Sequence, residues 1–327
     1  MFKYPLCKKA TNDILMIVFL ATVCAIGLNI VFVHVAADVL PELAVWQYVQ
    51  AANLALSPLQ FRWLSYFLPE IIISSGVDVV TTHLLFRTVY LGIALFFIGL
   101  IARRLIDNDM APIVMICAIS FYYAVSTQAH FQFSEEPNIM IYSIFIWLVI
   151  SNANFLFILS CFVFGALTKD TVGFLIPFYL IYCLRFNSFK YSILTTSILS
   201  SVFLAIYIGL RWYFGADREY LGGLWQYSEN LRYIFDRPDK GMMWTLASIL
   251  PLFFIAINWD RVPFVVKSFV PSAVLFIVGH LLISRVEEFR TYTPLAILLW
   301  SGVLAIKYNV YINSADTATP KSEYRAE

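Results

Sequence analysis

Long apolar runs, separated by short turns that hold most of the charges, dominate this sequence. A helix of about 20 residues crosses a hydrocarbon core of about 30 Å, and a helix bonds all of its own backbone groups inside such a core. The pattern therefore predicts an all-α, polytopic transmembrane helix bundle of about ten spans. The apolar runs lie near residues 14–35, 80–102, 110–126, 137–151, 154–168, 171–185, 190–213, 242–258, 263–284 and 291–309.

The composition excludes several classes of protein. Apolar residues make up 61% of the 327 residues and charged residues 13%, whereas soluble domains have roughly 45–50% and about 25%. These values exclude an ordinary soluble enzyme. The formal net charge of +1 provides no basic field that attracts nucleic acid, so we expect membrane lipids and no nucleic acid as partners. The histidines and cysteines show no metal-binding spacing.

Lysine and arginine residues in the short turns define the expected orientation. With the basic N-terminus inside, every second turn is basic, as the positive-inside rule requires. These turns contain Arg103 and Arg104, Arg185 and Lys190, Arg261 and Lys267, and Lys307. We therefore expect both termini in the cytoplasm, a single transmembrane domain over residues 1–312 and a polar cytoplasmic tail over 313–327. Short loops and the absence of an Asn-x-Ser/Thr sequon favour a bacterial inner membrane.

The first apolar run has the wrong length for a cleaved signal peptide. The apolar region of such a peptide has roughly 7–15 residues, and the run 14–35 is longer. We expect it to be a retained first span.

Two long loops, 36–79 and 214–241, fall on the outer side. In the first loop, apolar residues recur at three- and four-residue spacing between residues 40 and 52, which predicts an interfacial amphipathic helix. Between residues 61 and 70, aromatic rings surround one arginine and one glutamate, a composition typical of a segment at the level of the lipid headgroups. A re-entrant piece of the bundle at 60–74 is the alternative.

Four groups of ionisable residues lie beside apolar runs on the outer side, where an unpaired charge is costly. Asp38 and Glu42 are four residues apart and share one face if their segment is helical; alternatively, Asp38 caps a helix that starts near Pro41. Glu135 and Glu136 suit the first turn of a helix, because the helix dipole favours negative charge there. Two adjacent carboxylates are also able to bind a divalent cation or to share a proton.

The other two groups combine acidic and basic residues. Lys169 and Asp170 occupy a turn between two apolar runs that is almost too short to reach water. They form either a simple turn or a site in which Lys169 points inward and binds a phosphate. Arg285, Glu288 and Arg290 precede the last run. Arg290 can extend to the headgroups, pair with a glutamate one turn earlier or hold a phosphate bidentately.

The order of these features resembles the GT-C superfamily of polytopic membrane glycosyltransferases. The shared features are a first span, a long outer loop that opens with an acidic residue, interfacial helices and an acidic-basic motif before the last span. Asp38 matches the acidic position, with Glu42 as its substitute. The segments 60–69 (QFRWLSYFLP) and 288–294 (EFRTYTP) are also similar to short patterns in bacterial members.

This resemblance implies an inverting glycosyltransferase that takes a sugar from a polyprenyl phosphate donor on the extracytoplasmic side, as in the biosynthesis of cell-envelope polysaccharides. Asp38 would act as the general base on the acceptor hydroxyl. The candidates for neutralising the departing phosphate are Arg62, Lys169, Arg285 and Arg290. The candidates for binding the acceptor or a divalent cation are Glu135, Glu136, Asp170 and Glu288.

Two departures from the family pattern leave alternatives open. The chain lacks the adjacent Asp-Glu pair that many members carry in the first outer loop, and it has no large soluble C-terminal domain. A noncatalytic subunit that binds a protein partner in a larger membrane assembly is therefore the main alternative. A transporter or lipid flippase is the other, and Arg87 in the second run is the best-placed charge for that function.

Overall fold

The computed structural model describes residues 8–35, 37–38, 40–52, 54, 61–106, 108–126, 135–215, 227–236, 245–283 and 292–308. The described residues are mainly helical and contain no strand, which confirms the all-α prediction. The helices are α1 (Lys8–Val35), α2 (Glu42–Ala51), α3 (Trp63–Ile73), α4 (Val79–Leu105), α5 (Ala111–Ser126), α6 (Glu135–Ile150), α7 (Phe155–Thr168), α8 (Leu175–Phe186), α9 (Phe189–Phe214), α10 (Tyr227–Asp236), α12 (Leu250–Ile257), α13 (Phe264–Ile283) and α14 (Thr293–Lys307). Short helices of other types are the 3-10 helices η2 (Asp170–Phe174) and η4 (Trp259–Arg261) and the π helix η3 (Thr245–Ile249).

Each of the ten predicted apolar runs contains a helix. Among the residues that the structure describes, four segments are long and apolar enough to cross a membrane, namely Asn12–Val35, Val79–Leu105, Phe189–Phe214 and Phe264–Leu282. Two runs are less regular than expected: 171–185 begins with η2 before α8, and 242–258 contains η3 followed by α12. Pro251 lies in the first turn of α12, where the missing N–H of a proline does not break a helical hydrogen bond.

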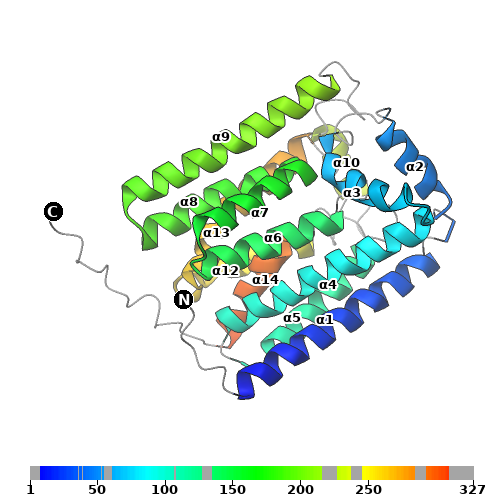
Figure 1. The fold of residues 1–327 in the computed structure, drawn as a ribbon. Helices are drawn as coiled ribbons and strands as arrows, with labels where there is room; N and C mark the ends of the chain where they lie inside the picture. Colours follow the sequence, from blue (N-terminus) through cyan, green and yellow to red (C-terminus); the bar gives the residue numbers. More distant parts are fainter. Residues whose placement is uncertain are drawn as a thin grey trace.

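The long helices lie side by side with α6 near the centre (Figure 1). On one side α6 packs on α4, which in turn packs on α1 and α5; on the other side it packs on α7, and α8 packs on α13 and α9. The three short helices α2, α3 and α10 gather at one end of the bundle in this view, whereas the α4–α5, α6–α7 and α8–α9 turns lie at the opposite end. The first end contains the helices of both predicted outer loops and is called the outer end below.

Aromatic rings fill the centre of the bundle. The ring of Phe145 on α6 lies 6.0 Å from Phe162 and 6.3 Å from Tyr179, measured between centroids. Close approach of α6 and α7 depends on Gly165, because a Cβ atom there would lie 2.6 Å from the side chain of Ile141. This tight packing fixes the position of the end of α7, which carries part of the candidate site.

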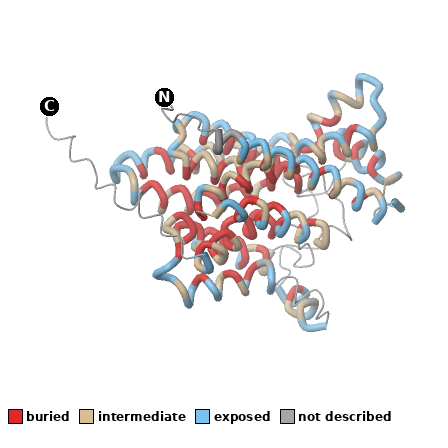
Figure 2. Tube along the Cα trace, turned by 90° about the horizontal axis from the view of Figure 1, so that it is seen from below, coloured by how far each residue is buried: buried red, intermediate tan, exposed pale blue. Residues whose placement is uncertain are grey.

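Buried residues face inward along the long helices and exposed residues face outward (Figure 2). Many of the outward residues are large and apolar, for example Leu15, Phe19 and Trp212. An apolar outer surface is costly in water but suits hydrocarbon, where helices are covered by lipid chains. The surface therefore agrees with a membrane protein.

Helix α2 confirms the predicted helix in the first outer loop, but its faces differ from the expectation. The side chains that it buries are Leu43, Gln47 and Gln50, whereas Val45 and Trp46 are exposed. Its two glutamines and Leu43 thus face the protein, whereas Val45 and Trp46 face outward, the arrangement expected of a helix that contacts lipid at the membrane surface.

The proposal that Asp38 caps a helix is wrong. Helix α2 starts at Glu42, its N-cap position is Pro41, and no side chain caps it. Proline has a backbone φ close to that of a helix, which explains why the helix begins here without a polar cap.

Candidate functional site

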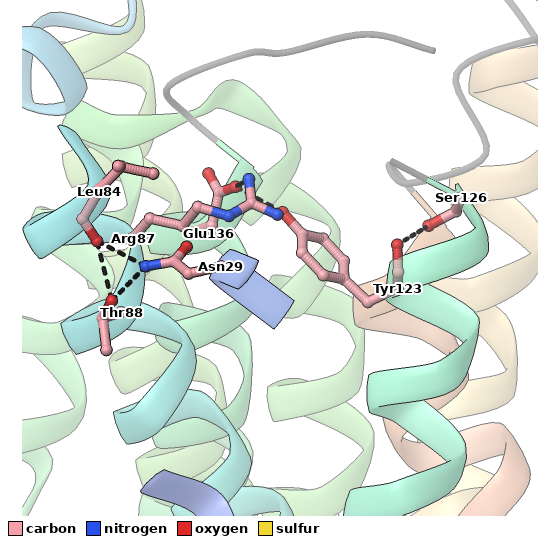
Figure 3. Close-up of polar contacts among 7 residues, drawn as sticks. All are labelled: Asn29, Leu84, Arg87, Thr88, Tyr123, Ser126 and Glu136. Atoms are coloured by element: carbon pink, nitrogen blue, oxygen red, sulfur yellow. Dashed lines mark hydrogen bonds and ion pairs between the residues drawn. The ribbon is translucent and has the colours of Figure 1, made fainter. Parts of the chain in front are cut away.

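Two glutamates at the outer end of α6 are buried, and each forms an ion pair with a basic side chain. Glu135 and Glu136 occupy the first turn of α6 and are only 1% and 3% exposed. The carboxylate of Glu135 lies 2.6 Å from Nζ of Lys169. Glu136 pairs with Arg87 of α4, and the hydroxyl of Tyr123 donates a hydrogen bond of 2.6 Å to the same oxygen (Figure 3). The structure thus provides each carboxylate with its own cation.

Arg87 of α4 contacts residues from three other helices. Its guanidinium lies 4.1 Å from the ring centroid of Phe32 on α1 and 5.4 Å from that of Tyr123 on α5. The ion pair with Glu136 comes from α6, and the side chain is 4% exposed. Aromatic faces attract a cation electrostatically, so these rings and the carboxylate together compensate a charge that an apolar helix alone would not tolerate.

Lys169 points inward because the chain leaves the helical conformation at this residue. Its backbone is extended, with φ −159° and ψ 135°, although its N–H still donates to the carbonyl of Gly165. The side chain is 2% exposed. Beyond it, Tyr142 donates a hydrogen bond of 2.5 Å to the carbonyl of Thr171, which ties η2 to α6. The simple-turn interpretation of Lys169 is therefore wrong, since its side chain is a buried ion-pair partner.

A third ion pair lies next to the other two and is looser. Nη2 of Arg211, on α9, lies 4.0 Å from the carboxylate of Asp170, and the two side chains are 22% and 40% exposed. The guanidinium of Arg211 lies 3.3 Å from the ring centroid of Tyr207 and 4.4 Å from that of Phe61. These four residues line a narrow pocket of about 10 Å³ together with the buried Arg62, roughly the volume that holds one water molecule.

The six charged residues form a row across the outer end of the bundle. Consecutive members are either ion-paired or adjacent in the sequence, so the row is continuous from α4 to α9. We call it the charge row, and it consists of Arg87, Glu136, Glu135, Lys169, Asp170 and Arg211.

An apolar pocket of about 250 Å³ adjoins the charge row. It lies between α3, α4, α6 and α7, and its lining includes Leu64 and Met140. Its lining also includes Pro137 and Thr168, which directly follow Glu136 and directly precede Lys169. At its edge Phe164 is more than half exposed on the outside of the bundle. The lining of the pocket thus includes a residue that is exposed on the outside of the bundle and two residues that are next in sequence to the buried ion pairs.

The structure brings together five of the predicted site residues. Arg62 and Asp170 line the narrow pocket, and the other three belong to the buried pairs of the charge row. Asp38 and Glu42 are exposed at the outer end and line neither pocket. The structure therefore does not join the predicted general base to the basic residues. Arg285, Glu288 and Arg290 lie outside the described residues.

Within the described part of the chain, no group of three or more histidine, cysteine, aspartate or glutamate residues is arranged to hold a metal ion. Glu135 and Glu136 lie in the first turn of α6, as predicted for carboxylates that interact with the helix dipole.

The sequence interpretation missed the partners of the charged residues. The sequence points to Arg87 only as a charge suited to transport, and it gives no prediction for Tyr123 or Arg211. The available signal was an arginine within or at the end of an apolar run, because such a residue needs an acidic or aromatic partner nearby. Glu136 and Asp170 were the acidic residues available to supply that partner.

A second polar network connects α2, α3 and α4 at the outer end. The amide nitrogen of Gln47 donates to the carbonyl of Tyr66 at 3.1 Å and to the carboxylate of Glu70 at 2.6 Å. The amide oxygen therefore faces Nε2 of His83 at 3.1 Å, and this ring nitrogen must be the donor. Burial raises the pKa of Tyr66 to about 12, so its hydroxyl stays protonated at neutral pH. The network holds α2 and α3 against the bundle.

The chain matches no protein-family model, no curated protein and no solved structure. Its function is therefore inferred from the geometry of the site.

Proposed function

We propose that this protein is an integral membrane glycosyltransferase that uses a polyprenyl phosphate sugar as donor at the outer end of the bundle. The single observation that carries the proposal is the meeting of an apolar, lipid-facing pocket with a row of buried charges. An amphiphilic donor has both parts, a hydrocarbon chain and an anionic head. Side-chain charges that are kept inside a membrane protein commonly mark a substrate site.

The apolar pocket suits the first part of the hydrocarbon chain. Its walls are apolar side chains from four helices, and it reaches the bundle surface near Phe164. Burial of hydrocarbon in such a pocket is favourable by roughly 25 cal/mol per Å² relative to water, and a ligand can enter sideways from the lipid. The head of the ligand would then lie beside Thr168 and Pro137, next to the charge row.

Asp38 is the proposed general base. It is exposed in the turn after α1. Phe32, near the end of α1, contacts Arg87 of the charge row. The acceptor oxygen forms a bond to the anomeric carbon while its proton moves to the Asp38 carboxylate. The bond from this carbon to the phosphate oxygen breaks, its electron pair leaves with the phosphate, and the anomeric configuration inverts. Arg62 is the residue proposed to stabilise the negative charge on the departing phosphate.

The first prediction tests this reaction with the full chain in proteoliposomes. The assay follows transfer of radiolabelled hexose from a polyprenyl phosphate hexose to a hydroxyl acceptor. D38N is expected to reduce the rate by at least about a hundredfold, because it removes the group that takes the proton, while the thermal unfolding temperature stays close to that of the parent.

The matched control is E229Q, which removes an exposed carboxylate from α10 at the same end. Its rate is expected to equal that of the parent. Unchanged transfer in D38N would reject Asp38 as the base. The proposal is contradicted if the parent protein transfers no hexose with any donor and acceptor tested. Recovery of the protein with a stoichiometric protein partner would then favour a noncatalytic subunit of a larger assembly.

A further inference from the structure

We infer that Cys24 and Cys117 are a redox modification site, at which a lipid-soluble quinone oxidises the two thiols to a disulfide bond between α1 and α5. The two residues are called the thiol pair below. Neither of them lines either pocket of the candidate site. The inference goes beyond the proposed function and does not depend on it.

The thiol pair lies where two apolar helices pack together. Cys24 is near the middle of the apolar segment Asn12–Val35 of α1, and Cys117 lies on α5. Helix α1 packs on both α4 and α5. Close to Cys24, the buried side of α1 carries Ala21 and Ala25, which are 1% and 0% exposed. Small residues at a helix interface let two backbones approach closely, so short side chains such as those of cysteine reach across it.

The two thiols are in direct contact. The side chain of Cys24 shares a hydrogen bond with the side chain of Cys117, and both cysteines are free. A disulfide requires Cα atoms less than about 7 Å apart and side chains that point toward each other. Thiols that contact each other from facing helices already have this direction. Formation of the bond therefore needs a short approach of the two sulfur atoms and no rearrangement of the bundle.

Exposure separates the thiol pair from the other described cysteines. Cys117 is exposed on the outside of the bundle and Cys24 is partly exposed. In contrast, Cys161 and Cys183 are only 8% and 5% exposed, and the thiol of Cys161 lies 3.7 Å from a backbone carbonyl, that of Ile141. Among the cysteines that the structure describes, an oxidant dissolved in the lipid therefore meets Cys117 first.

The surroundings of Cys117 favour an oxidant that dissolves in hydrocarbon. One turn further along α5, Phe121 is 73% exposed, so this face of the helix is apolar. Polar and charged oxidants enter such an environment at a high cost. A quinone is soluble in lipid and accepts two electrons. The S–H bonds of both cysteines break, one S–S bond forms, and two electrons and two protons pass to the quinone, which becomes a quinol.

The bond would connect the two helices whose rings contact Arg87. Phe32 follows Cys24 by eight residues and Tyr123 follows Cys117 by six, which is about two helical turns in each case. The guanidinium of Arg87 lies 4.1 Å and 5.4 Å from the centroids of these two rings. A disulfide two turns away would therefore fix the separation of α1 and α5 close to one end of the charge row.

The second prediction measures the disulfide directly in the full chain, reconstituted in phosphatidylcholine vesicles. The vesicles are treated with decylubiquinone, free thiols are blocked with N-ethylmaleimide, and the protein is digested without reductant for mass spectrometry. We expect a linked pair of peptides that contain Cys24 and Cys117, with two hydrogen atoms fewer than the separate peptides. Dithiothreitol is expected to separate them again.

Variants and the remaining cysteines supply the controls. C117A removes an exposed thiol and is expected to fold like the parent, and C24A is the second variant. The linked peptides are expected to be absent from both. Cys161 and Cys183 are expected to remain thiols under all conditions, because they are buried. A disulfide between two copies of the chain through Cys117, in place of the bond within one chain, would overturn the inference.

Two further oxidants test the pairing and the route separately. Copper phenanthroline joins neighbouring thiols, so the pairing is wrong if neither this complex nor decylubiquinone produces the bond. If the copper complex alone produces it, a quinone is not the oxidant. Anthraquinone disulfonate carries charges that keep it in water, and it is expected to oxidise the thiol pair more slowly than decylubiquinone. Equal or faster oxidation by this soluble quinone would overturn the route through the lipid.

Discussion

Glu135 and Glu136 are neighbours in the sequence, yet they form ion pairs with basic side chains on different sides of α6. Successive residues of an α-helix point about 100° apart, so adjacent side chains in one turn contact different helices. Glu136 contacts Arg87 of α4, and Glu135 contacts Lys169 at the end of α7. Two adjacent residues therefore connect the two sides of the bundle, which explains why both are almost fully buried.

The buried lysine gives a prediction at the same scale. K169M leaves the Glu135 carboxylate in the interior without its cation, so we expect a loss of about 3–5 kcal/mol in the free energy of unfolding. The double variant K169M/E135L is expected to recover most of this loss, because neither charge of this pair remains. Chemical unfolding in detergent measures both values.

A surface pair supplies the control for this measurement. Arg232 and Asp236 form an ion pair with side chains that are 84% and 62% exposed, and R232M is expected to change the free energy of unfolding by at most about 1 kcal/mol. If K169M has no larger effect than R232M, the buried pair does not stabilise the fold.

At the scale of single elements, α4 begins with a cap that responds to pH. The carboxylate of Asp78 accepts hydrogen bonds from the backbone N–H of Thr81 at 2.9 Å and from its hydroxyl at 3.1 Å. The hydrogen bond from the Thr81 N–H is the main reason that the pKa of Asp78 lies below its usual value. The ionised cap therefore stabilises the folded form, and protonation weakens it.

The pH dependence of this cap follows from the sign of the shift. The contribution of the ionised carboxylate is fully present above the pKa of the unfolded chain, about 3.9. It is lost as the pH falls through the lower pKa of the folded protein. The difference in unfolding temperature between the parent and D78A is thus expected to be constant from about pH 7 to 5 and to shrink below about pH 4. The control is D260A, which removes an exposed aspartate that is not a helix cap. If the difference in unfolding temperature between the parent and D78A does not change on acidification, the role of ionised Asp78 is contradicted.

For the whole molecule, the ends of the helices separate into two groups. The turn between α3 and α4 lies at the outer end, and the turn between α8 and α9 lies at the opposite end (Figure 1). Ser75 and Asn187 are exposed residues of these two turns. If the basic turns face the cytoplasm, a membrane-impermeant maleimide should label S75C in intact spheroplasts and N187C only after lysis. The parent protein controls for its own cysteines, and the reverse labelling pattern would invert the proposed orientation.

The sequence predicted the helices better than their contacts. Apolar runs and short charged turns are visible in the chain, which is why each predicted run contains a helix. The partners were not predictable in the same way. A helix that is apolar on all sides has no polar stripe to show which face is buried. Arg87 and Glu136 are 49 residues apart, and only the packing of α4 on α6 brings them together.

For the candidate site too, the sequence predicted the charged residues better than their contacts. The acidic and basic residues at the ends of the apolar runs are visible in the sequence, and one of the two interpretations of Lys169 has its side chain pointing inward. Its carboxylate partner depends on the contact between α6 and α7, which in turn depends on the close approach at Gly165. The position of Arg211 depends on its contact with Phe61, which is 150 residues away in the sequence. Neither contact leaves a local pattern in the sequence.

The neutrality of the four buried charges has an electrical consequence. Moving one elementary charge through the full thickness of a membrane with a voltage of 100 mV involves about 2.3 kcal/mol of work. Because Arg87, Glu136, Glu135 and Lys169 are two pairs of opposite sign, the field exerts no net force on them as a unit. A change in membrane voltage is therefore expected to leave these two ion pairs in place.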